Sequence, residues 1–282
     1  MGKQRLKRIQ AGRLVREVLW SAAYQSDPPK VRAAKMKCSS AARQKINDRY
    51  SWQKLKMTLA ANFSYTDLVV TLTYSDGHLP RNREEARKIL KRFLTQLRDY
   101  RRCRGKDLLY VYCIEDKHDE GRLHHHLVIN GTSQDYDLIR SLWTWGTDID
   151  IQPLEIWGYE ELAKYMTKEP REYGRVDLGA RTWVPSVNLR KPESPPAEWV
   201  PDSVRLEPPA NAHVLYKDQQ DNEWSRFAYI EYLLPELPIG QRTRPRKSKK
   251  CGDLYFSGSE QCILSEKGTE KGERTIAKHR DL

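Results

Sequence analysis

The chain has 282 residues, of which 50 are Lys or Arg and 38 are Asp or Glu, so its formal net charge at pH 7 is +12. This excess of positive charge favours a polyanionic partner, first of all a nucleic acid, over an acidic small molecule. The alternative is a basic surface that serves only solubility. The five cysteines are scattered without a CxxC pair, which argues against a disulfide framework and a zinc–thiolate site. Since no apolar run approaches the roughly 20 residues that span a bilayer, we expect a cytoplasmic protein with no membrane partner.

Residues 1–60 are predicted to form a basic helical extension. Helical spacing of apolar residues occurs twice, at Leu14, Val15, Val18 and Leu19 and again at Ala42, Ile46 and Tyr50. The segment SDPPK at 26–30 separates the two expected helices. From 30 to 56 the basic residues far outnumber the single acid, Asp48, which suits either an arm that lies on phosphates or two helices packed on the next domain.

Residues 61–170 have the pattern of a compact α+β domain, because the apolar period switches between two and about 3.6 several times. Asn82 with Glu85 makes a capping box for the first helix of this domain. The expected elements are a strand at 68–74, a helix from 82 to about 105, a hairpin of strands at 108–115 and 123–130, a helix at 135–143, a strand at 147–152 and a helix at 159–168. The order β-α-β-β-α-β with one added helix predicts a ferredoxin-like or RRM-like antiparallel sheet. That topology serves many functions.

The remainder of the chain is expected to be less regular. Residues 171–240 are predicted to be a C-terminal extension packed on the central domain, irregular at 191–201 (KPESPPAEWVP) and with strands at 212–217 and 224–233. Residues 241–282 begin with a run of Lys and Arg and continue as a polar segment, so we predict a disordered tail.

The segment GRLHHHLVIN at 121–130 places three histidines in a strand of large apolar residues. Because side chains alternate along a strand, His124 and His126 share one face and His125 points to the other. Glu115 ends the preceding strand of the hairpin, so its carboxylate lies across from the two imidazoles. Two His and one carboxylate can hold a catalytic metal and leave positions open for water or phosphate. The alternative is that His124 and His126 are hydrogen-bonded polar residues on a solvent-facing sheet surface.

The segment YEELAKYMTK at 159–168 is predicted to be a helix, with acids early and lysines late as the helix dipole favours. Tyr165 and Lys168 are three residues apart and share a face. By itself this spacing is also compatible with a half-buried tyrosine beside a solvated lysine.

Taken together, these segments resemble the HUH replication initiators of rolling-circle plasmids and of filamentous or small single-stranded phages. The resemblance runs from about Leu68 to Lys168 and, more loosely, through 181–192. In that family a strand like VVTLTY opens the domain, a GRxHxH strand supplies two metal ligands, and a helix with YxxK supplies the nucleophile and a basic partner. His125 stands where the family commonly has a hydrophobic residue, and no second tyrosine lies one turn before Tyr165, so this is the one-tyrosine kind.

The resemblance implies an endonuclease that nicks single-stranded DNA. Mg²⁺ or Mn²⁺ would be held by Glu115, His124 and His126. Tyr165, assisted by Lys168, would form a 5′-phosphotyrosine and leave a free 3′-OH, and the ends could later be rejoined. The implied partners are single-stranded DNA or an origin hairpin, with a host helicase and a polymerase. The tryptophans at 143, 145, 157 and 183 are either base-stacking residues or parts of the core.

Three alternatives stay open. A transposase or relaxase of the HUH class would use the same chemistry. A non-catalytic nucleic-acid-binding module would hold a structural metal with these histidines. A metal-dependent nuclease that uses water would not need Tyr165.

Overall fold

The structure is a computed structural model that describes residues 4–21, 41–116, 122–155, 159–168, 181–221 and 226–235. Every described residue belongs to one compact unit, Met1–Glu236. The tail predicted at 241–282 lies outside the described residues. None of the helices in the described ranges combines the length and the apolar character that crossing a bilayer requires.

The central part of the chain is α+β, with its elements in the predicted order. These elements are β3 (Leu68–Leu72), α2 (Arg83–Arg102), β4 (Tyr110–Asp116), β5 (Leu123–Ile129), α3 (Tyr136–Leu142), β6 (Ile149–Pro153) and α4 (Tyr159–Met166). The strands form an antiparallel sheet in the order β6-β3-β5-β4-β7, where β7 is Val184–Pro185. The β4–β5 hairpin is confirmed, and the ferredoxin-like description stays a prediction.

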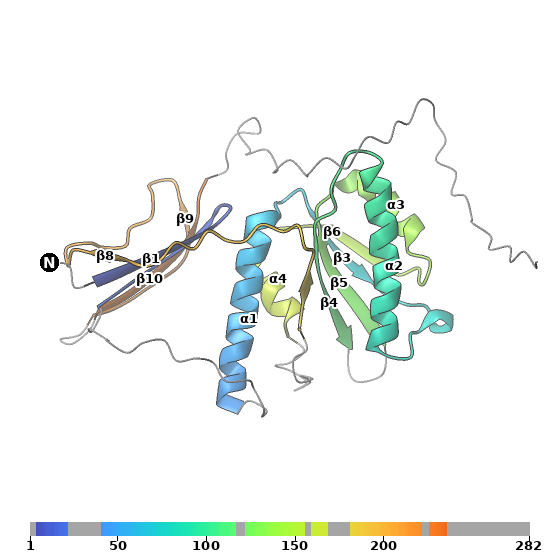
Figure 1. The fold of residues 1–282 in the computed structure, drawn as a ribbon, viewed down its shortest axis with the longest axis horizontal. Helices are drawn as coiled ribbons and strands as arrows, with labels where there is room; N and C mark the ends of the chain where they lie inside the picture. Colours follow the sequence, from blue (N-terminus) through green and yellow to red (C-terminus); the bar gives the residue numbers. More distant parts are fainter. Residues whose placement is uncertain are drawn as a thin grey trace, which may run out of the picture. The chain divides into compact units, whose positions relative to one another are not determined.

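Helices cover both faces of this central sheet (Figure 1). The predicted cap of α2 is present, because the Asn82 side chain accepts a hydrogen bond from the Glu85 backbone amide at 2.9 Å. Leu90, Phe93 and Leu97 of α2 are buried with Trp143, which follows α3, against one face of the sheet. On the other face, α4 and α1 (Ala41–Asn62) bury a second apolar cluster. The site described below lies on this second face.

The helix predicted around Leu14–Leu19 is wrong, whereas the second predicted helix is confirmed as α1. Residues 4–21 form a hairpin of β1 (Gln4–Ala11) and β2 (Leu14–Ser21), which turns at Gly12 with a positive φ of 57°. A Cβ at Gly12 would come within 2.3 Å of the Ala60 carbonyl oxygen, so the turn packs closely on α1. Both faces of β2 bury apolar side chains. Its apolar residues therefore occur in adjacent pairs, a spacing that imitates a helix.

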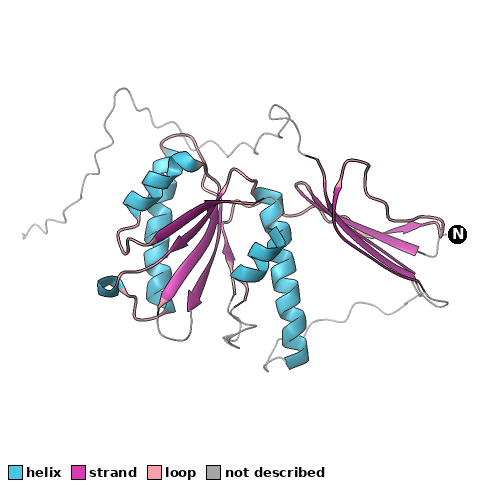
Figure 2. Ribbon diagram, turned by 180° about the vertical axis from the view of Figure 1, so that it is seen from behind, coloured by secondary structure: helices cyan, strands magenta, loops and turns pink. Residues whose placement is uncertain are grey.

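A second antiparallel sheet joins the two ends of the described chain (Figure 2). Its strand order is β8-β1-β2-β10-β9, with β8 at Glu198–Val200, β9 at His213–Asp221 and β10 at Arg226–Leu233. The predictions of strands near 212–217 and 224–233 are confirmed. The irregular segment predicted at 191–201 needs a correction, since β8 lies inside it and pairs with β1. Pairing with a distant strand stabilises this proline-rich stretch, and the local sequence carries no sign of it.

Candidate active site

The register of the central sheet decides which side chains meet on the face covered by α4. Glu115 of β4 is directly opposite His124 of β5, and His126 is opposite Cys113 of β4 and Thr71 of β3. Residues opposite one another in an antiparallel pair project from the same face. His124, His126 and Glu115 therefore share one face, as the alternation along the strand predicts.

His125 projects from the other face into the core, as alternation also predicts. Its side chain is fully buried, with Nε2 2.6 Å from Tyr74 Oη and its ring centroid 5.8 Å from that of Trp143. Burial lowers the pKa of His125 to about 3, so the ring is neutral at physiological pH. His125 is a packing residue, and the tryptophan at 143 is likewise part of the core.

Four of the five predicted site residues come together in one polar cluster. Glu115 is at its centre, with Oε2 2.6 Å from His126 Nε2 and Oε1 2.8 Å from Lys168 Nζ. Tyr165 Oη lies 3.3 Å from His126 Nε2, and the two rings meet edge to face with centroids 4.9 Å apart. Lys168 Nζ lies 4.0 Å from the centroid of the Tyr165 ring. The cluster thus contains a phenol, an imidazole, a carboxylate and an ammonium group.

The charges in the cluster define its resting state. Burial raises the pKa of Glu115, but hydrogen bonds from His126 and Lys168 outweigh this effect and hold the pKa at about 2. Because the ionised carboxylate can only accept, His126 must carry its proton on Nε2, where it donates to Glu115. His126 Nδ1 lies 3.2 Å from Thr71 Oγ1. In this state His126 cannot take a proton from Tyr165.

Tyr165 is a neutral phenol in the same state. Burial of part of its ring and the negative charge of Glu115 raise its pKa, and the nearby ammonium of Lys168 offsets only part of this rise. Its side chain is nevertheless 43% exposed. The pocket lined by Glu115, His126, Tyr165 and Lys168 is small, about 10 Å³. A substrate would therefore reach the phenol along the protein surface rather than inside a cavity.

The third predicted metal ligand, His124, lies on the same face, directly opposite Glu115. Within the described ranges, no three His, Cys, Asp or Glu side chains converge on a common point that could hold a metal ion. The donor types nevertheless fit a divalent cation, since a carboxylate oxygen and an imidazole nitrogen already lie 2.6 Å apart beside His124. The ligand set of Glu115, His124 and His126 stays a prediction.

Two features of the site were missed in the sequence. Thr71 supports the His126 ring, and its position at an alternate residue of β3 was the available signal. Thr182 lines the pocket from a segment far along the chain and lies 3.0 Å, oxygen to oxygen, from Ser51 of α1. Of the two unassigned histidines, His78 is hydrogen-bonded to Ser75 Oγ at 2.8 Å in a turn, and His118 lies outside the described residues.

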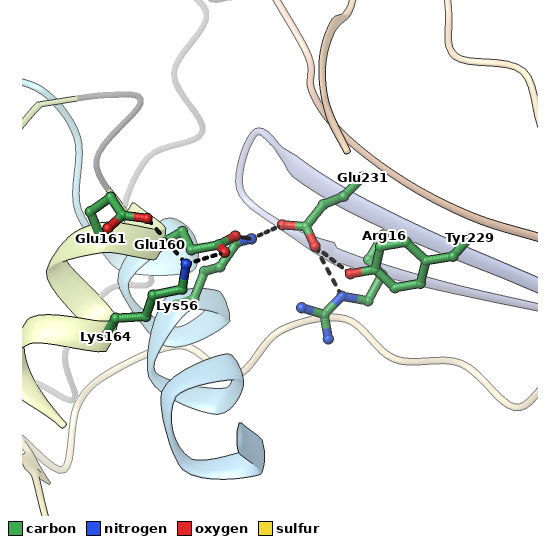
Figure 3. A network of polar contacts seen from close by, with 7 residues as sticks. All are labelled: Arg16, Lys56, Glu160, Glu161, Lys164, Tyr229 and Glu231. Carbon is green, nitrogen blue, oxygen red and sulfur yellow. Dashed lines mark hydrogen bonds and ion pairs between the residues drawn. The ribbon is translucent and has the colours of Figure 1, made fainter. Parts of the chain in front are cut away.

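A buried network of charges holds α4 against α1 and the second sheet (Figure 3). Lys56 of α1 is only 3% exposed, and its Nζ lies 2.6 Å from Glu160 in the first turn of α4. Lys56 also pairs with Glu231 of β10, whose carboxylate accepts from Arg16 Nε at 3.3 Å. On the exposed side of α4, Lys164 Nζ lies 2.9 Å from Glu160. The network therefore ties the helix that carries Tyr165 to both neighbours.

We expect Lys56→Met to lower the free energy of unfolding by about 3 kcal/mol, because it leaves the buried carboxyl group of Glu231 without one of its two cationic partners. Lys164→Met is the matched control. It removes a lysine of the same network from the solvent-exposed side, where a pair contributes less than about 1 kcal/mol. Urea unfolding of both variants measures the difference. Equal losses in the two variants would show that the buried network does not anchor the helix.

A family model matches the central part of the chain. Neither the curated proteins nor the solved structures contain a match to this chain. The family model of the replication-associated protein ORF2/G2P matches residues 67–170. This segment contains all four residues of the polar cluster. The central part of the chain is therefore similar to replication-associated proteins.

Proposed function

We propose that this protein is a replication initiator that nicks single-stranded DNA at an origin, with Tyr165 as the nucleophile. The observation that carries the proposal is the cluster itself. An accessible phenol lies 3.3 Å from an imidazole and about 4 Å from an ammonium, and both of these groups are held by one buried carboxylate. The similarity of residues 67–170 to a replication-associated family supports the choice of DNA as substrate.

In the proposed reaction, Tyr165 Oη attacks the scissile phosphorus and the bond from phosphorus to the 3′ oxygen breaks. The exposed phenol loses its proton to water and the departing 3′ oxygen takes one from water, so the products are a 5′-phosphotyrosine and a free 3′-OH. A polymerase can extend this 3′-OH. The phosphotyrosine bond keeps the energy of the original phosphodiester, so attack by a 3′-OH in the reverse direction rejoins the ends.

The neighbours of Tyr165 have distinct parts in this step. Lys168 places a positive charge near the ring and stabilises the phenolate as the proton leaves. Glu115 orients both Lys168 and His126 through charge-assisted hydrogen bonds. Glu115, His126 and His124 would hold Mg²⁺ or Mn²⁺, and such an ion would offset the negative charge of the phosphate.

The substrate we propose is single-stranded DNA or the unpaired part of an origin hairpin, as the resemblance of residues 68–168 to the rolling-circle initiators implies. A host helicase and a polymerase would act after the nick. A transposase or relaxase of the same class would share the chemistry and differ in the DNA that is recognised.

The experiment that tests the proposal is incubation with labelled single-stranded DNA and Mn²⁺, followed by a denaturing gel. The substrates are a pool of random sequences and a pool of hairpins, each labelled at either end. We expect cleavage of single strands, a product that stays attached to protein after denaturation, and loss of both with a chelator. Cleavage with two protein-free products would favour the water-using nuclease. Binding without any cleavage would favour the non-catalytic module.

A further inference from the structure

One face of the second sheet carries a row of aromatic side chains with an arginine between them. Arg5 of β1 is directly opposite Trp199 of β8 on one side and Trp20 of β2 on the other, and Trp20 is opposite Phe227 of β10. Directly opposed residues project from the same face of a sheet. Trp199, Arg5, Trp20 and Phe227 therefore form one row across four strands, which we call the aromatic row. Trp199 is 57% exposed and Phe227 is 38% exposed.

More aromatic and basic groups continue this face beside the aromatic row. Lys7 and Tyr229 share the face two residues further along β1 and β10. Tyr216 of β9 is 55% exposed, and its ring centroid is 5.6 Å from that of Tyr229. The Arg5 guanidinium lies 5.1 Å from the centroid of the Trp199 ring. Rings and cations thus lie side by side on this face, together with Asp218 of β9, which is directly opposite Tyr229.

The two faces of the second sheet differ sharply among the described residues. The opposite face is closed by an apolar cluster of its own, which contains Val15, Leu19, Leu206, Ala228, Ile230 and Tyr232. The face with the aromatic row contacts α1 at one end only, where Ala11, Leu14 and Leu233 are buried with Leu55 and Leu59. Beyond that contact the rings of Trp199 and Phe227 reach solvent, although burying them would be favourable. Exposed large rings gathered in this way mark an interaction surface.

We propose that the face with the aromatic row binds a single strand of nucleic acid. The choice of nucleic acid as the ligand rests on the function proposed above. Unpaired bases stack on Trp199, Phe227 and Tyr216, and the phosphates lie near Arg5 and Lys7. Every base has an aromatic face, so stacking of this kind is strong and tolerates any sequence. The cations between the rings match the negative backbone of a nucleic acid, as does the net charge of +12.

The buried charge network joins this face to the candidate active site. Arg16 and Tyr229 lie on the face with the aromatic row, and both contact Glu231 (Figure 3). Glu231 pairs with Lys56, which in turn pairs with Glu160 of α4. A single-stranded nucleic acid bound to the second sheet is therefore held by the same compact unit that positions Tyr165. This face would add affinity for the DNA outside the nicked phosphate, with little dependence on base sequence.

The test is the affinity of the full chain for a fluorescein-labelled oligothymidine, measured by anisotropy in a chelator so that no cleavage occurs. Loss of one stacked base costs roughly 1–3 kcal/mol, so Trp199→Ala and Phe227→Ala should each raise the Kd by about 5- to 150-fold. Tyr100→Ala is the matched control. Tyr100 of α2 is 39% exposed and also lies beside a guanidinium, that of Arg104, but it is outside this face. The Kd of the Tyr100→Ala variant should equal that of the wild type.

Two further variants separate binding from folding. Trp199→Phe keeps an aromatic face and should retain most of the affinity that Trp199→Ala loses. Arg5→Gln keeps the rings and should make the Kd less dependent on salt, because fewer counterions are released. A Kd that stays the same in both alanine variants would overturn the proposal.

Light scattering measures self-association and so tests whether a second copy of the chain, rather than nucleic acid, covers this face. If the alanine variants lose self-association and keep their DNA affinity, the face is a contact between copies of the chain and the proposal is wrong. The assay is also independent of the proposed chemistry. If the alanine variants bind DNA more weakly but the wild type never nicks DNA, this inference is retained and the proposed function is rejected. If the wild type nicks DNA and the alanine variants bind DNA with normal affinity, the proposed function is retained and this inference is rejected.

Discussion

Tyr165→Phe is expected to abolish nicking, with a loss of at least about a thousandfold in rate, and to remove the protein–DNA adduct while DNA binding is retained. The substitution deletes only the hydroxyl oxygen that would form the bond to phosphorus. The ring still packs edge to face on His126 and still lies beside Lys168, so the fold of the cluster is preserved. Gel analysis under denaturing conditions measures the adduct and the nick together.

Tyr159→Phe is the control for this prediction, because Tyr159 begins the same helix. Its hydroxyl donates to the Phe63 carbonyl oxygen at 2.6 Å and its side chain is buried, which makes it a structural residue. The variant should lose about 1 kcal/mol of stability and keep its adduct. An adduct in Tyr165→Phe that maps to another tyrosine would keep the class of reaction and reject Tyr165 as the nucleophile. Continued cutting without an adduct would replace the tyrosine mechanism by hydrolysis.

His126→Ala and His125→Ala are expected to fail in different ways, although the two residues are adjacent in the chain. His126→Ala removes the donor to Glu115 and one predicted metal ligand, so cleavage should fall by at least about a thousandfold. His124→Ala should have the same effect if His124 joins the ligand set. Calorimetric titration of Mn²⁺ into the protein should show weaker binding in both variants.

His125→Ala should lower stability instead of removing cleavage. It creates a cavity in the core and leaves the Tyr74 hydroxyl without its partner, at a cost of about 3 kcal/mol. Urea unfolding measures this loss, and cleavage assayed well below the transition should be reduced only slightly. If the folded His126→Ala protein cleaves at the wild-type rate, the proposed role of that face of β5 is wrong.

Much of the central domain could be predicted because its signals are local. The capping box at Asn82 begins α2, and the buried stripe of Leu90, Phe93 and Leu97 repeats with the period of a helix. Alternation along the strand separates His124 and His126 from His125. Each of these signals depends only on residues that are close together in the sequence, within one helix or one strand. They can therefore be recognised without the tertiary structure.

The N-terminal hairpin shows where a local signal fails. Leu14, Val15, Val18 and Leu19 have helical spacing, yet they lie on a strand that buries Leu14 on one face and Val15 and Leu19 on the other. Periodicity cannot separate this case from a helix, because a strand that buries apolar side chains on both faces loses its alternation. The outcome was decided by β10 and β8, which pair with this hairpin from the far end of the described chain.

The sequence by itself determined the α+β class of the central domain, the order of its elements and the face on which each histidine lies. Only the tertiary structure decided which groups touch. Lys168 reaches Glu115, Lys56 joins Glu231 to Glu160, and the aromatic row is assembled from three separate segments of the chain. The physical reason is that period and capping are properties of neighbours in sequence, whereas an ion pair or a row across a sheet depends on a register between strands that are far apart along the chain.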